Sequence, residues 1–277
     1  MDVLKIAAFS DGDVGGNPAG VLVSKAHPSD GEMRRIAAAV GFSETAFAAP
    51  TAAGWRVRYF SPESEVPFCG HATIALGAAL ALQRGDGTFA LALNQADITV
   101  EGHRRDGVIS AALQSPPTRS AGADLELVAD ILRLFDYSDN DLDPELPPAR
   151  AHGGADHLVV GLNSRSKLAA MRYDLAAGRA LMNRAGLVTI CFAYAETPQR
   201  FHTRNPFASG GVYEDPATGA ATAALAGYLR DLSWPHGGAI DIIQGEDMGM
   251  RSLLRAEILP EPGSSIRVSG TARIIAD

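Results

Sequence analysis

Two stretches of sixteen residues decide the fold that this sequence predicts: residues 65–80, EVPFCGHATIALGAAL, and residues 214–229, EDPATGAATAALAGYL. With the chain shifted by 149 residues, eight of the sixteen aligned pairs are identical. The identical pairs are Glu65/Glu214, Pro67/Pro216, Gly70/Gly219, Ala72/Ala221, Thr73/Thr222, Ala75/Ala224, Leu76/Leu225 and Leu80/Leu229. Because the units of solenoid proteins are only about 20–50 residues long, this longer period indicates two related halves of one protein.

Both stretches predict a helix that begins at a glycine and is buried on all sides. The segments after Gly70 and Gly219 are apolar on nearly every face, which is typical of a helix enclosed by other elements. Alternating runs elsewhere predict many strands, among them residues 55–60 (WRVRYF) and 98–102 (ITVEG). We therefore expect an α+β fold of two pseudo-symmetric halves, each a curled, barrel-like mixed β-sheet around a central buried helix.

The halves share a second pattern, an amphipathic helix that leads through a glycine into a strand. In the first half, residues 29–32 (SDGE) form a capping box, and apolar side chains then recur at helical spacing. Gly41 is the expected C-terminal cap, and the strand 42–49 (FSETAFAA) follows it. In the second half, a helix ends at Gly186 and the strand 187–195 follows.

The predicted boundary between the halves lies near the middle of the chain. Residues 114–123 (QSPPTRSAGA) are rich in proline, serine and glycine, which is typical of a linker. We expect a first half of residues 1–115, joined by the C-terminal strand at about 265–277, and a second half of residues 116–264. The cleft between the halves is expected to receive the N-termini of both buried helices and to form the active site.

The composition excludes several classes of function. The 277 residues include 24 basic and 32 acidic side chains, a net charge of −8, so nucleic acid and anionic membrane surfaces are not expected partners. The longest strongly apolar stretch, residues 72–82, is far shorter than the ~20 residues of a membrane span. The N-terminal residues lack the features of a secretory signal, and two cysteines provide no disulfide framework or zinc cluster. We expect a cytoplasmic protein.

The two helix N-termini are expected to bind an anionic group of a substrate. The first turn of a helix has backbone N–H groups without intrahelical partners and carries a partial positive charge. A carboxylate, or an enolate-like charge that develops during proton abstraction, is stabilised at such a position. We assign Gly70, Gly219 and Ala220 to substrate binding, because small residues allow close approach to the backbone. The alternative is that the glycines serve only tight turns, but their recurrence in both halves favours binding.

Cys69 and His71 lie on either side of Gly70. A thiol at a helix N-terminus ionises readily and can act as a base or nucleophile. The 149-residue shift places Thr218 opposite Cys69 and Ala220 opposite His71, so a two-thiol racemase would lack its second thiol. We interpret Cys69 as a packed residue. His71 either orients a polar substrate or makes a hydrogen bond that fixes the loop.

Glu44 is the candidate for proton transfer. It begins an otherwise apolar strand, where a carboxylate is partly desolvated and suited to exchange a proton; the alternative is an exposed glutamate at a strand end. Placing Gly41 over Gly186 puts Thr189 opposite Glu44, which favours one residue moving a proton over a two-base inversion. Asp215 either binds a substrate amine or hydroxyl or forms a turn.

Four motifs together resemble the phenazine-biosynthesis PhzF-like family, which has the diaminopimelate-epimerase-like fold. They are GNPAGVLV (16–23), FSETAF (42–47), YFSPESEVPFCGHAT (59–73) and EDPATGAA (214–221). The resemblance runs from about Phe9 to the C-terminal strands and so covers nearly the whole chain. It implies two pseudo-symmetric halves with the site between them, a homodimer, and no metal or organic cofactor.

The resemblance also implies roles for individual residues. In the phenazine enzyme, the glutamate of the SET motif moves a proton during isomerisation of a dihydro-hydroxyanthranilate, a role that falls here on Glu44. The histidine of GHxT and the aspartate of EDPxTG correspond to His71 and Asp215, and both are implied to bind or orient the substrate. Asn17 of the GNP motif is implied to lie near the ligand. Ala220 stands where the family commonly has serine, so the phenazine substrate itself is not implied.

The leading hypothesis is a cofactor-independent isomerase of a small, carboxylate-bearing metabolite, for example an amino or cyclic compound, with Glu44 as the single proton carrier. One alternative is an amino-acid epimerase or racemase that uses Glu44 and a second acid on the opposite face of the substrate. The other is a catalytically silent binding or interaction protein of the same fold.

Overall fold

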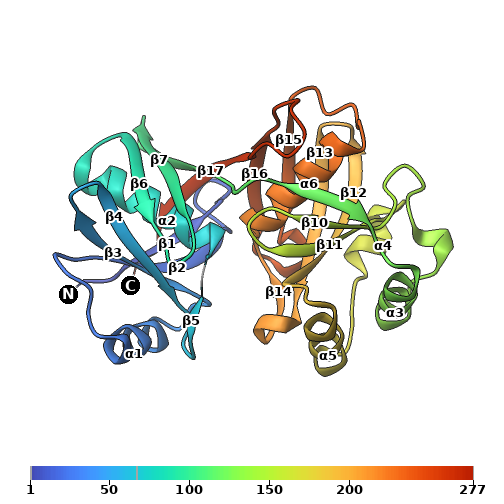
Figure 1. The fold of residues 1–277 in the computed structure, drawn as a ribbon, viewed down its shortest axis with the longest axis horizontal. Helices are drawn as coiled ribbons and strands as arrows, with labels where there is room; N and C mark the ends of the chain where they lie inside the picture. Colours follow the sequence, from blue (N-terminus) through green and yellow to red (C-terminus); the bar gives the residue numbers. More distant parts are fainter. Residues whose placement is uncertain (1, 67, 277) are drawn as a thin grey trace. The chain divides into compact units, whose positions relative to one another are not determined.

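The computed structural model describes residues 2–66 and 68–276, and the chain divides into two compact units. The first unit consists of Met1–Gln114 with Val268–Asp277, and the second of Ser115–Arg267. In each unit a mixed sheet curls around a buried helix (Figure 1), which confirms the predicted α+β class. Among the described residues, no helix is long and apolar enough to cross a membrane.

The sheet of the first unit closes into an eight-stranded mixed barrel. Its strands are β1 (Leu4–Ala8), β2 (Asn17–Val23), β3 (Thr45–Thr51), β4 (Gly54–Phe60), β6 (Gly87–Ala92), β7 (Asp97–Arg105), β8 (Val108–Gln114) and β17 (Arg267–Ile274). Pairing follows the order β1, β2, β3, β4, β6, β7, β8, β17 and returns to β1, with parallel pairs β2–β3 and β4–β6. A short strand, β5 (Glu65–Val66), pairs with β4 outside this ring.

Helix α2 (Gly70–Arg84) fills the barrel. It packs mainly against β1, β2, β3, β6, β7 and β8, and every residue from Gly70 to Ala81 is buried. The helix therefore has no polar face, as the sequence predicts.

Helix α1 (Asp30–Val40) covers the outside of the barrel against β3 and β4. Its N-terminus has the predicted capping box, in which the Glu32 backbone N–H donates to Ser29 Oγ at 3.4 Å and the Ser29 backbone N–H donates to Glu32 Oε2 at 3.0 Å. Gly41 ends the helix with a left-handed φ of 76°, which confirms the predicted cap.

The second unit repeats the strand order of the first. Its strands are β9 (Arg119–Gly122), β10 (Ala149–His152), β11 (Asp156–Gly161), β12 (Thr189–Thr197), β13 (Arg200–Phe207), β14 (Val212–Asp215), β15 (Ala239–Gln244) and β16 (Ser252–Glu257). The pairs β11–β12 and β13–β15 are parallel, as β2–β3 and β4–β6 are, and β14 pairs with β13 as β5 pairs with β4. The buried helix α6 (Gly219–Asp231) packs against β9, β10, β11, β12 and β16.

Three helices and three short 3-10 segments complete the second unit. They are α3 (Leu125–Phe135), α4 (Arg165–Ala169), α5 (Leu175–Ala185), η1 (Asp139–Asp141), η2 (Ala208–Gly210) and η3 (Glu246–Met248). Helices α3 and α5 pack on each other, and α5 ends at Gly186 as predicted. Residues 114–123, interpreted as the linker, include the change from the first unit to the second after Gln114, but residues 119–122 form β9, which pairs with β10.

A bidentate ion pair also recurs in both units. In the first unit, Arg58 of β4 donates through Nε and Nη2 to the carboxylate of Glu65, at 2.8 and 2.6 Å. In the second, Arg204 of β13 makes the corresponding pair with Glu214 of β14. Glu65 and Glu214 occupy equivalent positions of the sequence repeat, so this glutamate anchors the chain just before each buried helix.

Close contact between β7 and α2 requires glycine at position 102. A Cβ at Gly102 would overlap the carbonyl oxygen of Gly77 in α2 and lie 2.9 Å from Ala81 Cβ. Gly87 faces Gly102 across the β6–β7 pair, yet a Cβ there meets no atom closer than 3.9 Å.

We therefore expect Gly102→Ala to destabilise the protein by about 1–3 kcal/mol, because the barrel must shift away from its helix. Gly87→Ala, the matched control, is expected to change the free energy of unfolding by less than about 0.5 kcal/mol. Calorimetric unfolding of both variants checks this. Equal unfolding temperatures for the two variants would contradict the packing argument.

Candidate active site

Glu44 lies between the end of α1 and the beginning of β3, and its position is held by the backbone. Its carbonyl oxygen accepts a hydrogen bond from the Gly20 N–H at 3.2 Å, one residue before the β2–β3 ladder begins. A Cβ at Gly20 would lie only 2.6 Å from Thr45 Oγ1, so the missing side chain lets the two strands approach here. Glu44 is not an exposed strand-end residue, since it is only 7% exposed.

The N-terminus of α2 is held by hydrogen bonds to the carbonyl of its N-cap residue, Cys69. The Thr73 N–H and Thr73 Oγ1 both donate to that carbonyl, at 3.0 and 2.7 Å, and Tyr59 Oη lies 2.6 Å from Thr73 Oγ1. The Cys69 side chain makes no capping hydrogen bond. Gly70 and His71 are the first two residues of the helix, so their N–H groups have no carbonyl partner within it.

These elements bring Glu44 and His71 together. Glu44 Oε2 lies 3.4 Å from His71 Nε2, and both side chains are buried. Ser43 Oγ lies 3.5 Å from the same ring nitrogen, and Cys69 Sγ lies 3.4 Å from His71 Nδ1. Glu44 Oε2 is buried with no hydrogen-bond partner among the described residues. Leaving a buried acceptor unpaired is costly, so this oxygen is available to a ligand.

Asp215 ends β14 in the second unit and belongs to a hydrogen-bonded cluster. Its Oδ2 accepts a bond of 2.6 Å from Thr218 Oγ1. Gln244, the last residue of β15, donates from Nε2 to the Asp215 carbonyl at 2.6 Å and to Thr218 Oγ1 at 2.9 Å. The Thr218 N–H donates back to Gln244 Oε1 at 3.1 Å. Gln244 thus orients the Thr218 hydroxyl towards Asp215.

Sequence reasoning missed Gln244 entirely. It ends the run AIDIIQ, where nothing distinguishes it from an exposed polar residue, yet it is only 1% exposed. Its role depends on the parallel pairing of β15 with β13. This pairing joins distant segments, and no local sequence motif predicts it.

The N-terminus of α6 resembles that of α2. Thr218 is the N-cap residue in place of Cys69, its side chain likewise makes no capping bond, and Gly219 begins the helix. The Thr222 N–H donates to the Thr218 carbonyl at 2.9 Å, as that of Thr73 does to Cys69. Gly219 is buried and Ala220 is half-buried. Their N–H groups also have no carbonyl partner within the helix.

In the second unit, the position equivalent to Glu44 is Thr189, which belongs to a network of uncharged side chains. Thr189, the first residue of β12, lies with its Oγ1 2.8 Å from His157 Nδ1 and donates to Asn205 Oδ1 at 3.3 Å. All three side chains are buried, and burial lowers the pKa of His157 to about 3, so its ring is neutral at ordinary pH. The second unit therefore has no carboxylate at the position of the first unit's candidate base.

Asn17, the remaining predicted site residue, begins β2 and is 2% exposed. It pairs with Ala8 in the β1–β2 ladder, three residues before Gly20. Its role near a ligand stays a prediction.

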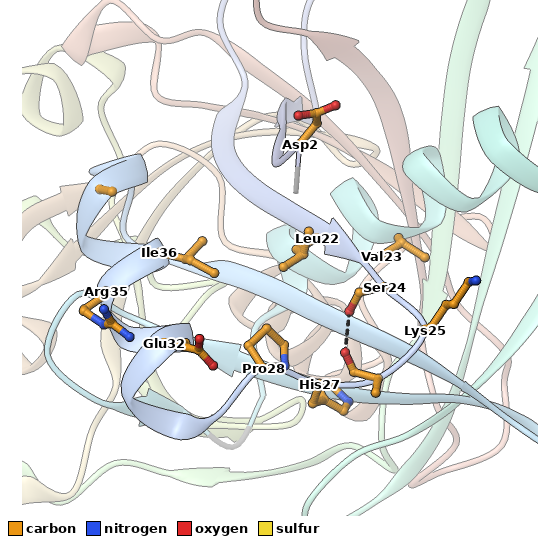
Figure 2. A pocket seen from close by; sticks show the side chains of 12 residues that line it. Asp2, Leu22, Val23, Ser24, Lys25, His27, Pro28, Glu32, Arg35 and Ile36 are labelled. Atoms are coloured by element: carbon orange, nitrogen blue, oxygen red, sulfur yellow. Dashed lines mark hydrogen bonds between the residues drawn. The ribbon is translucent and has the colours of Figure 1, made fainter.

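A separate hollow of about 910 Å³ lies in the first unit between the end of β2, the following loop and α1 (Figure 2). Leu22 and Ile36 contribute apolar surface, and Glu32 and Arg35 contribute charge. His27 also lines it, and burial lowers the pKa of this histidine. The described lining residues include none of those predicted for the active site, so we do not assign the chemistry to this hollow.

Comparison with known proteins decides the family. A profile of the family described as phenazine biosynthesis-like protein (PhzC-PhzF) matches residues 6–277. The chain belongs to this family. The resemblance inferred from the four sequence motifs is thereby confirmed.

Curated proteins named as isomerases match nearly the whole chain. The trans-2,3-dihydro-3-hydroxyanthranilate isomerase of Pseudomonas chlororaphis is 34% identical over 273 residues, covering 96% of this chain and 94% of that protein. The uncharacterized isomerase YddE of Escherichia coli K12 is 29% identical over 286 residues, covering 99% and 96%.

Solved structures show the same fold. A phenazine biosynthesis protein of the PhzF family from Bacillus anthracis superposes with a TM-score of 0.85 at 21% identity, covering 100% of this chain and 98% of that one. A probable proline racemase from Agrobacterium radiobacter has a TM-score of 0.69 at 11% identity, covering 99% and 91%. The phenazine biosynthesis-like fold is thus shared with a structure named as a probable proline racemase.

Proposed function

We propose that this chain is an isomerase of a small carboxylate-bearing metabolite and that Glu44 moves the proton. The named isomerases that match the chain over nearly its full length support the reaction class. The observation that carries the role of Glu44 is its geometry: Oε2 is buried, has no hydrogen-bond partner among the described residues, and lies 3.4 Å from His71 Nε2.

The proposed reaction is a proton shift within one molecule. Glu44 accepts a proton from one carbon of the substrate, its carboxyl exchanges that proton with solvent, and it delivers a proton to another carbon, so atoms and electrons are conserved and no redox cofactor is required. His71 hydrogen-bonds to the substrate and orients it against Glu44. The N-terminus of α2, at Gly70, stabilises the negative charge that develops as the proton leaves.

We further propose that Asp215, Gly219 and Ala220 bind polar groups of the substrate, with Asn17 near the ligand. Ala220 offers a backbone N–H and no hydroxyl, so we expect a substrate that differs from dihydro-hydroxyanthranilate in the group bound there. The resemblance alone supports a homodimer, and light scattering after size-exclusion chromatography tests it.

Thr218→Val tests the Asp215 cluster, since it removes the hydroxyl donor at nearly equal volume. A hydrogen bond to a charged group contributes about 1.5–3 kcal/mol, so we expect substrate affinity to fall by about 10- to 100-fold. Thr222→Val, which makes the same substitution one helical turn later in the chain, is the matched control. Steady-state kinetics of both variants check this, and equal KM values would exclude Thr218 from the site.

The experiment that tests the proposed function begins with a thermal-shift screen of small carboxylates against the wild type and Glu44→Gln. A ligand at 100 times its Kd adds about 2.7 kcal/mol of stability. Ligands that bind both proteins are then incubated in deuterium oxide. We expect isomerisation with wild type only; full turnover by Glu44→Gln would remove Glu44 from the mechanism.

The comparisons do not favour the two-base epimerase, because the curated relatives are named isomerases. The sequence of the second unit agrees with this, since it has Thr189 and Thr218 at the positions equivalent to Glu44 and Cys69. Loss of optical purity at a stereocentre would nevertheless identify an epimerase. A silent binding protein of this fold predicts that no candidate carboxylate reacts.

A further inference from the structure

The side chains of Glu44, Cys69 and His71 form a cluster of three different metal-binding groups. Each offers one ligand atom, and the three atoms lie within 4.8 Å of one another. We propose that this cluster binds a zinc ion, which blocks the site by occupying Glu44. The cysteine count argues against a zinc cluster made of several thiols, but Glu44 and His71 supply the other ligands.

The distances suit a tetrahedral zinc ion. Zinc binds carboxylate oxygen and imidazole nitrogen at about 2.0–2.2 Å and thiolate sulfur at about 2.3 Å. At tetrahedral angles, these bond lengths place nitrogen and oxygen ligands about 3.3 Å apart and nitrogen and sulfur ligands about 3.6 Å apart. The observed separations are 3.4 Å between His71 Nε2 and Glu44 Oε2 and 3.9 Å between His71 Nε2 and Cys69 Sγ. All three ligand atoms lie within 4.8 Å of one another, so rotation of the Glu44 and Cys69 side chains brings them to bonding distance of one ion.

A second observation indicates a ligand at this position. Glu44 Oε2 is directed at the histidine, its side chain is only 9% exposed, and the oxygen has no hydrogen-bond partner among the described residues. A buried acceptor without a partner is stabilised by a cation, which repays the cost of its burial.

The chemistry of the three ligands favours zinc over magnesium and calcium. Thiolate and imidazole prefer zinc and other borderline-soft ions, whereas magnesium and calcium prefer oxygen ligands alone. Three protein ligands leave a fourth tetrahedral position for water or a substrate carboxylate. When zinc binds, the Cys69 thiol releases its proton to solvent as the Zn–S bond forms, and no group changes oxidation state.

The consequence for activity rests on the proposed function, whereas the binding itself does not. An oxygen of Glu44 that is bound to zinc cannot accept a proton from the substrate. Zinc is therefore expected to inhibit the isomerase, and a chelator is expected to restore turnover.

The test titrates the whole protein with zinc chloride in a calorimeter, against Cys69→Ser, Glu44→Gln and the control Cys191→Ala. Cys191 is a buried thiol of the second unit, outside the cluster. Losing a group that only supports a metal ligand costs about 10–100-fold in affinity, so losing a ligand is expected to cost at least about 100-fold. We expect one zinc ion per wild-type chain, weakened binding to Cys69→Ser and Glu44→Gln, and unchanged binding to Cys191→Ala. Magnesium chloride should produce no binding heat.

Cobalt chloride provides a second readout, because a cobalt–thiolate bond gives a charge-transfer band in the near ultraviolet. The band should appear with the wild type and Cys191→Ala and be absent with Cys69→Ser. Equal zinc affinity of all variants, or no cobalt band with the wild type, would overturn the inference. Zinc binding without any turnover would contradict the proposed function instead, and turnover without zinc binding would contradict only the metal site.

Discussion

Glu44→Gln is expected to lower turnover by at least about 10³-fold while leaving the fold intact. A general acid–base group contributes about 10²–10⁴-fold, and Glu44 is the only proton carrier in the proposed reaction. The amide has nearly the same shape but cannot carry a proton between two carbons. Stability should be preserved, because the substitution breaks no hydrogen bond at Oε2.

Kinetics and thermal unfolding of the same protein sample check both parts of this prediction. Glu65→Gln is the matched control: it makes the same chemical change in the same unit, at a glutamate that pairs with Arg58. We expect the control to retain wild-type turnover. Comparable losses of turnover in both variants would show that the effect is not specific to Glu44.

Glu214→Gln is expected to lower the free energy of unfolding by about 3–5 kcal/mol. This is the largest loss of stability expected for any of the substitutions. Glu214 is 4% exposed and Arg204 is 7% exposed, so the variant leaves a guanidinium buried without its carboxylate. The equivalent change in the first unit, Glu65→Gln, is expected to cost only about 1 kcal/mol or less, because Arg58 and Glu65 are partly exposed.

Differential scanning calorimetry of the two single variants measures this contrast. The double variant Arg204→Met with Glu214→Met should recover most of the loss, because it removes both buried charges. Equal effects of Glu214→Gln and Glu65→Gln would contradict the burial argument.

Repeats and helix boundaries made much of the fold predictable. The match between residues 65–80 and 214–229 predicted two buried helices, which the structure places as α2 and α6. The capping box and Gly41 predicted both ends of α1. These features are local, because side chains near a helix end bond to backbone groups a few residues away.

Contacts between distant segments were not predictable from the sequence alone. Residues 119–122 were interpreted as linker because of their composition, yet they form β9 through pairing with β10. Helix α3 was not predicted, although its apolar residues Ile131, Leu132 and Phe135 are buried.

In the candidate site, too, local motifs were predictable and contacts between distant segments were not. Glu44 and His71 were predicted from motifs, whereas their 3.4 Å separation follows from folding β3 beside α2. Gln244 was missed because its partners, Asp215 and Thr218, lie 29 and 26 residues away in the sequence. A polar residue at a strand end becomes recognisable as a site residue only when its partners are known.

The isomerase activity and the role of Glu44 are tested most directly by a nuclear magnetic resonance assay in deuterium oxide, with small amino and cyclic carboxylates incubated with wild type or Glu44→Gln. We expect wild type to convert at least one of them to an isomer. We also expect deuterium to enter the isomer at the newly protonated carbon, and Glu44→Gln to bind the same compound without converting it. Conversion and deuterium entry at equal rates with both proteins would contradict the role of Glu44, and no conversion of any bound carboxylate would contradict the isomerase itself.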